Sequence, residues 1–312
     1  MSWPGRVRNR VRVNMRVVGL PLIVGLVLVT GIAPSAFGQQ NNNWKPVEDA
    51  MGRPGTVIGE VLRFGMPRKD LHVMVRGTAI KAGLALGSWA AFSKMGKDAM
   101  VMGDLVLTED EIEPVMRKLQ EGGIEIAAIH NHLIGEQPRV LYMHIESRGD
   151  AVQMATAIHE ALGLSKTPGP DAAPAAGTSE LSGLDQKTIE GIMGRSGKVN
   201  GGILAFGVPR AETITDAAMV VPPSMGVATA LNFQPTGEGK AAITGDFVLL
   251  GKEVNPVMKA LREHGIDVTA VHSHMLTEEP RLFFMHFWAN DDATKLAKGL
   301  RAALDLSNSA KQ

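Results

Sequence analysis

The stretch Ile124-Glu-Ile-Ala-Ala-Ile-His130-Asn-His132, followed after six residues by Arg139-Val-Leu-Tyr-Met-His144-Ile145, decides the fold of this chain. Apolar residues and then two histidines occupy every second position from 124 to 132, which is the spacing of side chains on one face of a β-strand. The second stretch is the next predicted strand. The segment therefore predicts two neighbouring strands, with His130 and His132 on the face that begins apolar.

The chain matches itself at an offset of 142 residues. The histidine pattern recurs in full as His272-Ser-His274 and His286. One offset shared by several segments of the chain predicts a tandem duplication of one domain. Other segments that match at the same offset are Phe64–Arg68 with Phe206–Arg210, and Gly103-Asp104 with Gly245-Asp246.

Within one copy, the periodicities predict a β-rich α+β fold. Thr108-Glu-Asp-Glu111 is typical of a capping box before a helix, and Asp150 is typical of the cap of a second helix. Each repeat is predicted to follow the order βββαββα, and the two homologous repeats either pack with pseudo-two-fold symmetry or stand as separate domains. Three further strands are expected at residues 61–64, 73–80 and 89–92.

The N-terminal 38 residues are typical of a secretory signal. Five arginines precede an apolar run over 17–33, and Ala36-Phe37-Gly38 resembles a cleavage site. A retained membrane anchor is disfavoured because Pro21 and Gly25 interrupt a short run. The predicted organisation is a signal peptide at 1–38, a first repeat at 39–164, a linker rich in Pro, Gly and Ala at 165–182, and a second repeat at 183–312.

Composition supports an exported protein that does not bind nucleic acid. Cleavage of the signal leaves 27 basic against 32 acidic side chains, a net charge of −5, without the basic excess that nucleic acid attracts. The chain has no cysteine, so disulfides, thiolate ligands and a lipid-modified cysteine are excluded. A periplasmic or extracellular location is expected, without a transmembrane anchor after cleavage.

The repeated histidine pattern predicts metal binding in both copies. Three imidazoles and one carboxylate are a sufficient ligand set for a divalent transition metal such as zinc, manganese, iron or copper. Two alternatives remain: histidines that only bond to the backbone, and a metal in one copy alone. The predicted ligands are His130, His132, Glu136 and His144 in the first copy, and His272, His274, Glu278 and His286 in the second.

Candidate catalytic residues accompany each site. Glu136 and Glu278 are candidates for a general base, and Arg139 and Arg281 for binding a small anionic ligand, although surface ion pairs explain the arginines equally well. The Gly-Asp pairs are typical of turns, which leaves Asp104 and Asp246 as secondary candidates.

Five segments of the first repeat carry a resemblance to a known family: Ser88–Phe92, Met102–Leu107, Pro114–Met116, His130–Leu133 and Tyr142–Ile145. Through them the chain resembles the LppY/LpqO family of exported bacterial proteins. The resemblance covers nearly the whole mature chain and implies an extracytoplasmic bacterial protein, but no activity, because the family is catalogued as a domain of unknown function.

Three functions fit these motifs. The first is a metal-dependent hydrolase that activates a metal-bound water. The second is an extracytoplasmic protein that binds or handles metal without turnover, and the third is a structural envelope protein with incidental histidines. An open coordination position beside a cleft favours catalysis, whereas a saturated site favours binding.

Overall fold

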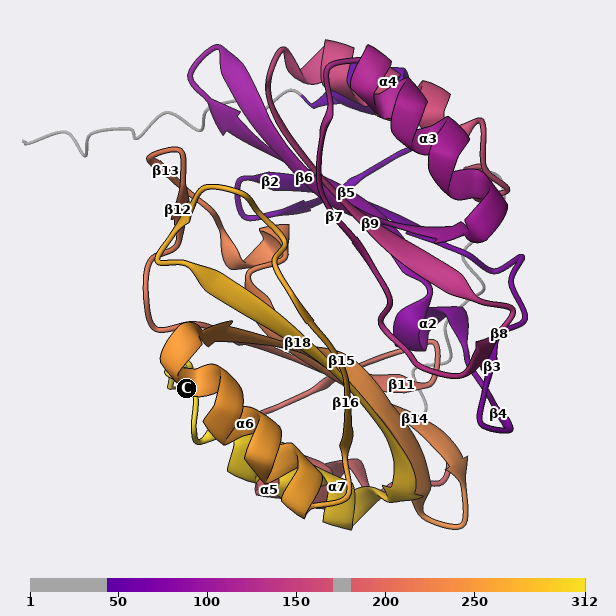
Figure 1. Ribbon diagram of the computed structural model, residues 1–312, viewed down its shortest axis with the longest axis vertical. Helices are drawn as coiled ribbons and strands as arrows, with labels where there is room; N and C mark the ends of the chain where they lie inside the picture. The colour runs from indigo at the N-terminus through magenta and orange to yellow at the C-terminus, as the bar shows by residue number, and fades with distance from the viewer. Residues whose placement is uncertain (1–43, 171–180, 312) are drawn as a thin grey trace, which may run out of the picture. The chain divides into compact units, whose positions relative to one another are not determined.

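Each repeat folds into a six-stranded antiparallel sheet with its longer α-helices on one face (Figure 1). The computed structural model describes residues 44–170 and 181–311. In spatial order the first sheet contains β1 (Thr56–Ile58), β2 (Val61–Pro67), β5 (Gly87–Met95), β6 (Asp98–Thr108), β9 (Val140–Gly149) and β7 (Glu125–His130). The second contains β10 (Lys198–Asn200), β11 (Ile203–Pro209), β14 (Ala228–Gly237), β15 (Lys240–Leu250), β18 (Leu282–Asp292) and β16 (Asp267–His272).

The helices pack on the outer face of each sheet, where an apolar core joins helix and sheet. The same order of elements in both repeats confirms the α+β fold and the tandem repeats. The outer-face helices of the first repeat are α1 (Lys45–Met51), α3 (Glu109–Glu121) and α4 (Ala151–Leu162), and those of the second are α5 (Gln186–Met193), α6 (Gly251–Glu263) and α7 (Ala293–Leu304).

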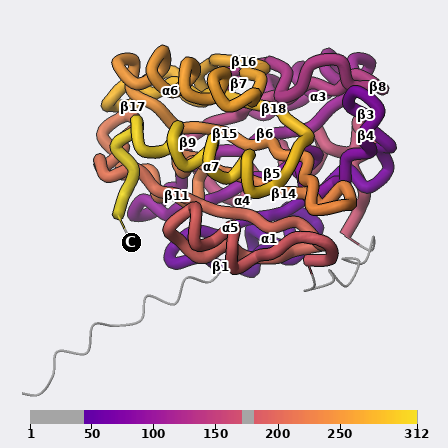
Figure 2. Tube along the Cα trace, turned by 90° about the horizontal axis from the view of Figure 1, so that it is seen from below, coloured from indigo at the N-terminus to yellow at the C-terminus, as the bar shows by residue number. Residues whose placement is uncertain are grey.

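The inner faces of the two sheets pack against each other. One apolar cluster joins Met100 and Met102 of the first repeat to Met275 and Phe284 of the second, and another joins Tyr142 to Trp288. The described residues of both repeats accordingly form one compact unit. Edge strands β7 and β16, far apart in sequence, are in contact and lie side by side (Figure 2).

Short elements of each repeat reach across this interface. Lys81 N, beside α2, donates to Gln234 Oε1 at 2.8 Å, and Gln234 Nε2 donates to Ala79 O at 2.7 Å. These reciprocal bonds fix the loop of one repeat on the sheet of the other. The short elements are β3 (Met74–Val75), β4 (Thr78–Ala79), α2 (Ala82–Ala85), β8 (Glu136–Gln137), β12 (Thr215–Asp216), β13 (Met219–Val220), the 3-10 helix η1 (Pro223–Met225) and β17 (Glu278–Glu279).

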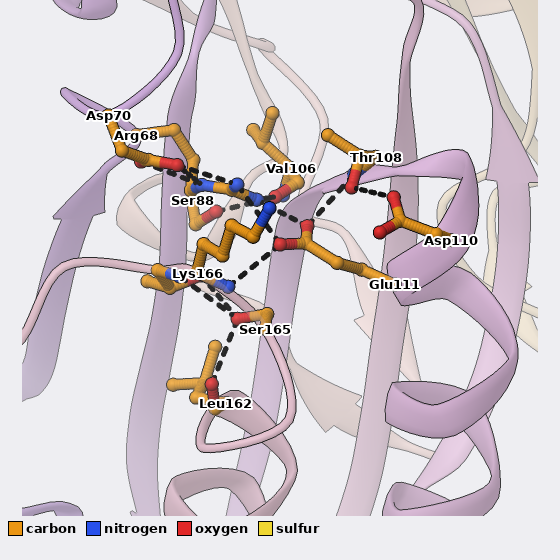
Figure 3. Close-up of polar contacts among 11 residues, drawn as sticks. Arg68, Asp70, Ser88, Val106, Thr108, Asp110, Glu111, Leu162, Ser165 and Lys166 are labelled. Atoms are coloured by element: carbon orange, nitrogen blue, oxygen red, sulfur yellow. Dashed lines mark hydrogen bonds and ion pairs between the residues drawn. The ribbon is translucent and has the colours of Figure 1, made fainter.

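The helix starts expected from sequence are confirmed. Thr108 N donates to Glu111 Oε2 at 2.9 Å at the start of α3, and the Asp150 carboxylate accepts from the first turn of α4. Glu111 also pairs with the fully buried Arg68 at 2.7 Å, as Figure 3 shows. The second repeat has the same pair in Arg210 and Glu253, also at 2.7 Å.

The strand predicted at 73–80 is wrong, because a turn splits it into β3 and β4. Arg76 and Gly77 both have positive φ, of 48° and 84°, which no strand accommodates. β6 was not predicted as a strand, because its interior residues are buried on both faces and show no alternation. The predicted signal peptide, and residues 171–180 of the predicted linker, lie outside the described residues. None of the described helices has the length and apolar character needed to span a bilayer.

Candidate metal centre

Six histidines, three from each repeat, meet where the two inner sheet faces pack together. The ring centroids of His130 and His272, at the ends of edge strands β7 and β16, are 3.5 Å apart. The other close pairs across the interface are His132 with His286 and His144 with His274, each at 3.7 Å. The two sites predicted from sequence thus merge into one cluster.

Two groups within this cluster have the spacing of metal ligands. In each group, one nitrogen of every histidine lies within 4.8 Å of the others. One group contains only residues of the first repeat. The other contains one histidine of the first repeat and three of the second, and His130 is common to both groups. The groups are His130, His132 and His144, and His130, His272, His274 and His286.

Asp104 and Asp246 lie beside the histidines because of strand register. β6 pairs Asp104 with His144, and β15 pairs Asp246 with His286. Asp104 Oδ2 is 3.6 Å from His132 Nε2, and the equivalent Asp246 Oδ2 is 3.3 Å from His274 Nε2. Each repeat therefore adds one buried or nearly buried carboxylate to the cluster.

Many polar atoms of the cluster are buried without a hydrogen-bond partner. Within the described residues this holds for Nε2 of all six histidines, His272 Nδ1, and one carboxylate oxygen each of Asp104 and Asp246. An unpartnered buried polar atom costs about 1–3 kcal/mol, so nine together at one place indicate a bound ion or ligand.

The backbone orients several imidazoles for ligation. His286 Nδ1 donates to Gly245 O at 2.8 Å, and His130 Nδ1 donates to Asn131 O at 3.1 Å. A proton on Nδ1 leaves the lone pair of Nε2 free to bind a metal. Tyr142 stacks on His132 at 3.3 Å, and Phe284 stacks on His274 at 3.4 Å, which restricts both rings.

Burial keeps the imidazoles neutral. It lowers the pKa of His130 to about 4 and that of His286 to about 3. It also lowers the pKa values of His132, His144, His272 and His274, further lowered by neighbouring imidazoles. Neutral imidazole is the form that binds metal, so all six are ready ligands at neutral pH.

A cavity of about 460 Å³ adjoins the cluster, and residues of both repeats line it. The cavity is large enough for a small organic molecule. Its wall includes both aspartates and four of the histidines, and Arg63 is the only Lys or Arg among the described residues that line it. A ligand in the cavity would therefore contact the donor atoms of the cluster.

The structure does not bring the predicted glutamates and arginines into either histidine group. Glu278 accepts from Leu282 N at 2.9 Å and pairs with Arg281 at 3.2 Å, and Glu136 lies in β8, opposite Val75. Arg139 is exposed and pairs with Glu109 at 3.2 Å. The surface ion pairs that the sequence left open for Arg139 and Arg281 are thus present.

The turns expected at the two Gly-Asp pairs are wrong, because both pairs lie inside strands, β6 and β15. Glycine is needed there for close packing of the backbone. A Cβ at Gly245 would lie 1.8 Å from Ala230 O, and one at Gly103 would lie 2.7 Å from Trp89 O. The repetition of Gly-Asp at the offset of the histidines was the available signal for these aspartates.

Replacing Gly245 with alanine is expected to destabilise the fold by about 1–3 kcal/mol, because the main chain of β14 must move. Urea unfolding monitored by tryptophan fluorescence measures this. Gly65→Ala is the matched control, since a Cβ there meets nothing within 4 Å. Equal stability of the two variants would contradict the close approach at Gly245.

Comparison with known proteins gives a family but no activity. The trimeric bacterial microcompartment shell protein PduB is similar at 12% identity, over 84% of this chain and 97% of that chain, with a TM-score of 0.22. EtuB from Clostridium kluyveri is similar at 8% identity, over 82% and 91%, with a TM-score of 0.21. Such low TM-scores carry no argument about fold or function. No curated protein sequence matches the chain.

A family model matches the two repeats separately, over residues 45–164 and 187–306. The two matches are 142 residues apart, the same offset as the histidine patterns. The chain therefore belongs to the family described as Domain of Unknown Function (DUF1259) and carries two copies of its domain.

Proposed function

We propose that this is an exported protein that binds a divalent transition metal between its two repeats. The observation that carries the proposal is the convergence of six histidines whose Nε2 atoms are all buried and lack a partner. The signal-like N-terminus supports export. Zinc, iron and copper suit a site rich in imidazole, and manganese is included because carboxylates adjoin it.

Asp104 and Asp246 are better placed than Glu136 and Glu278 to supply the carboxylate. Ligands 2.0–2.2 Å from a tetrahedral zinc ion are roughly 3.3 Å from one another. The distance of 3.3 Å between Asp246 Oδ2 and His274 Nε2 fits this value, and the corresponding 3.6 Å at Asp104 is close to it. We therefore assign the carboxylate ligand to the aspartates.

Replacing His130 with alanine is expected to weaken metal binding by about 100-fold or more, because His130 belongs to both ligand groups. The measurement is elemental mass spectrometry of tag-free mature protein after reconstitution with zinc, manganese, iron or copper, followed by competition with a chelator. His72→Ala, which removes an exposed histidine, is the control.

Wild-type protein is expected to hold one or two ions. His272→Ala is expected to weaken binding only at the group of four histidines, because His272 is absent from the other group. No bound metal in the wild type after all four reconstitutions would overturn the proposal. An equal loss in His72→Ala would show that the metal binds elsewhere.

The cavity beside the cluster favours catalysis over storage. A metal ion held by the histidines and aspartates, with one coordination position facing the cavity, would supply the activation of water for attack on a substrate. A metal-dependent hydrolase is therefore the second candidate function. Turnover of p-nitrophenyl esters and phosphates by metal-loaded protein, abolished in Asp104→Asn, would support it, and a metal-loaded protein without turnover would favour metal handling.

A further inference from the structure

A cation and an indole line the cavity on the first repeat's side and have no counterpart on the second repeat's side. Arg63 on β2 and Trp89 on β5 line it from the first repeat. The register of the second sheet places Ala205 and Ala230 at the equivalent positions, since Trp89 pairs with Asp104 as Ala230 pairs with Asp246. The histidines and aspartates are duplicated, but the cation and the indole are not.

Contacts from both repeats hold Arg63 in place. Its guanidinium carbon lies 3.9 Å from the centroid of the Trp89 ring, and Nη1 donates to Ser224 O at 2.7 Å. Trp89 in turn packs against Gly226, where a Cβ would lie 2.9 Å from Cη2 of the indole. A guanidinium held on two sides is preorganised to present its remaining N–H groups to a planar or tetrahedral anion.

The formal charges of the cavity favour an anion. One divalent ion and Arg63 bring three positive charges, against two negative charges when both Asp104 and Asp246 are ionised. The alanines and glycines on the second repeat's side leave space opposite Arg63, in a cavity of about 460 Å³. A small molecule with an oxyanion group would balance the charge and fill this space.

We propose that Arg63 and Trp89 form a subsite for the oxyanion group of a small ligand, a carboxylate or a phosphate, beside the metal centre. The position of the ligand beside a metal ion rests on the proposed function, whereas binding of its oxyanion group by Arg63 does not. The duplication thus produced a symmetric donor set with an asymmetric binding subsite, and the first repeat holds the anionic end of the ligand.

The test is calorimetric titration of zinc-loaded protein with inorganic phosphate and, separately, with succinate. Arg63→Ala is expected to weaken binding of the preferred anion by about 10-fold or more, because it removes charge-assisted hydrogen bonds. Arg63→Lys keeps the charge but not the planar fork, and an intermediate loss is expected. Arg117→Ala removes an exposed arginine on α3 as the control.

Bound zinc and the thermal unfolding midpoint are measured for every variant. Unchanged zinc with Arg63-dependent anion binding supports the subsite, and the preferred probe identifies carboxylate or phosphate as its ligand. Anion affinity equal in Arg63→Ala and wild type, or no anion binding at all, overturns it while the metal centre stands. If the wild type binds none of the four metals, the proposed function fails, and the same titrations of metal-free protein decide the subsite alone.

Discussion

Metal-free protein is expected to unfold far more easily at about pH 4.5 than at pH 6.5, because unfolding exposes six buried histidines to protonation. Burial lowers the pKa of His130 from 6.5 to about 4 and that of His286 to about 3, and it lowers the pKa values of the other four. Between these values and 6.5 each histidine is neutral when folded and protonated when unfolded. The histidines therefore have no effect on stability above pH 6.5, and they destabilise the folded protein increasingly as the pH falls below it.

The two aspartates act in the opposite direction. Burial raises the pKa of Asp104 to about 8 and that of Asp246 well above its ordinary 3.8, so the folded carboxyls keep protons that they lose on unfolding. Six histidines take up protons on unfolding, whereas Asp104, Asp246 and Glu146, whose pKa burial raises to about 7, release them. Uptake exceeds release, and each net proton is worth about 1.4 kcal/mol per pH unit, so stability is expected to fall as the pH falls below 6.5.

Urea unfolding of chelator-treated protein from pH 4.5 to 7.5 measures this slope. The double variant His132→Gln/His274→Gln removes two of the six histidines that take up protons and is expected to reduce the slope. His72→Gln, at an exposed position, serves as the control. A flat profile in the wild type, or the same slope in the double variant, would contradict the buried neutral cluster. Bound metal is expected to raise stability at neutral pH, because only the folded protein presents the ligand set.

Replacing Glu111 with alanine is expected to destabilise the protein by about 3 kcal/mol, because it removes the more deeply buried of the two carboxylates, Asp70 and Glu111, that pair with fully buried Arg68. The Glu111 carboxylate accepts from Arg68 Nη1 at 2.7 Å, from Thr108 N at 2.9 Å and from Lys166 N at 2.7 Å (Figure 3). It thereby ties the end of β2 to the start of α3 and to the chain after α4.

The pKa of Glu111 shows which effect dominates. Burial by itself raises the pKa, but the hydrogen bonds from Arg68, Lys166 N and Thr108 N outweigh it and leave the pKa lowered. The folded protein therefore stabilises the ionised form of Glu111. Glu111→Gln keeps the shape and loses the charge, and a smaller loss of stability than in Glu111→Ala is expected.

Urea unfolding at neutral pH compares these variants with Glu109→Ala. Glu109 is in the same first turn of α3, but it is exposed and pairs only with exposed Arg139, so a change within about 0.5 kcal/mol is expected. The second repeat offers an independent replicate, because Glu253 accepts from Arg210, Leu250 N and Asn308 N in the same arrangement. A loss at Glu111 no larger than at Glu109 would contradict the role of the buried pair.

Local signals predicted the elements that depend on neighbours in sequence. Thr108 and Glu111 predicted the start of α3, and Asp150 predicted that of α4, because capping bonds join residues two or three apart. β6 and the turn at Arg76-Gly77 were missed. Buried and exposed residues do not alternate along β6, and the turn includes a non-glycine residue, Arg76, in a left-handed conformation.

The sequence by itself determined that the domain is duplicated, that each copy is an α+β fold, and that six histidines stand in matched positions, since repetition and periodicity are properties of the chain order. The tertiary structure alone decided that the histidines of both copies meet in one cluster, and that Asp104 and Asp246 adjoin it in place of Glu136 and Glu278. It also placed Arg63 in the cavity wall. These residues come from strands that are distant in sequence, and only the register of β6 with β9, and the packing of the inner face of one sheet on that of the other, brings them together.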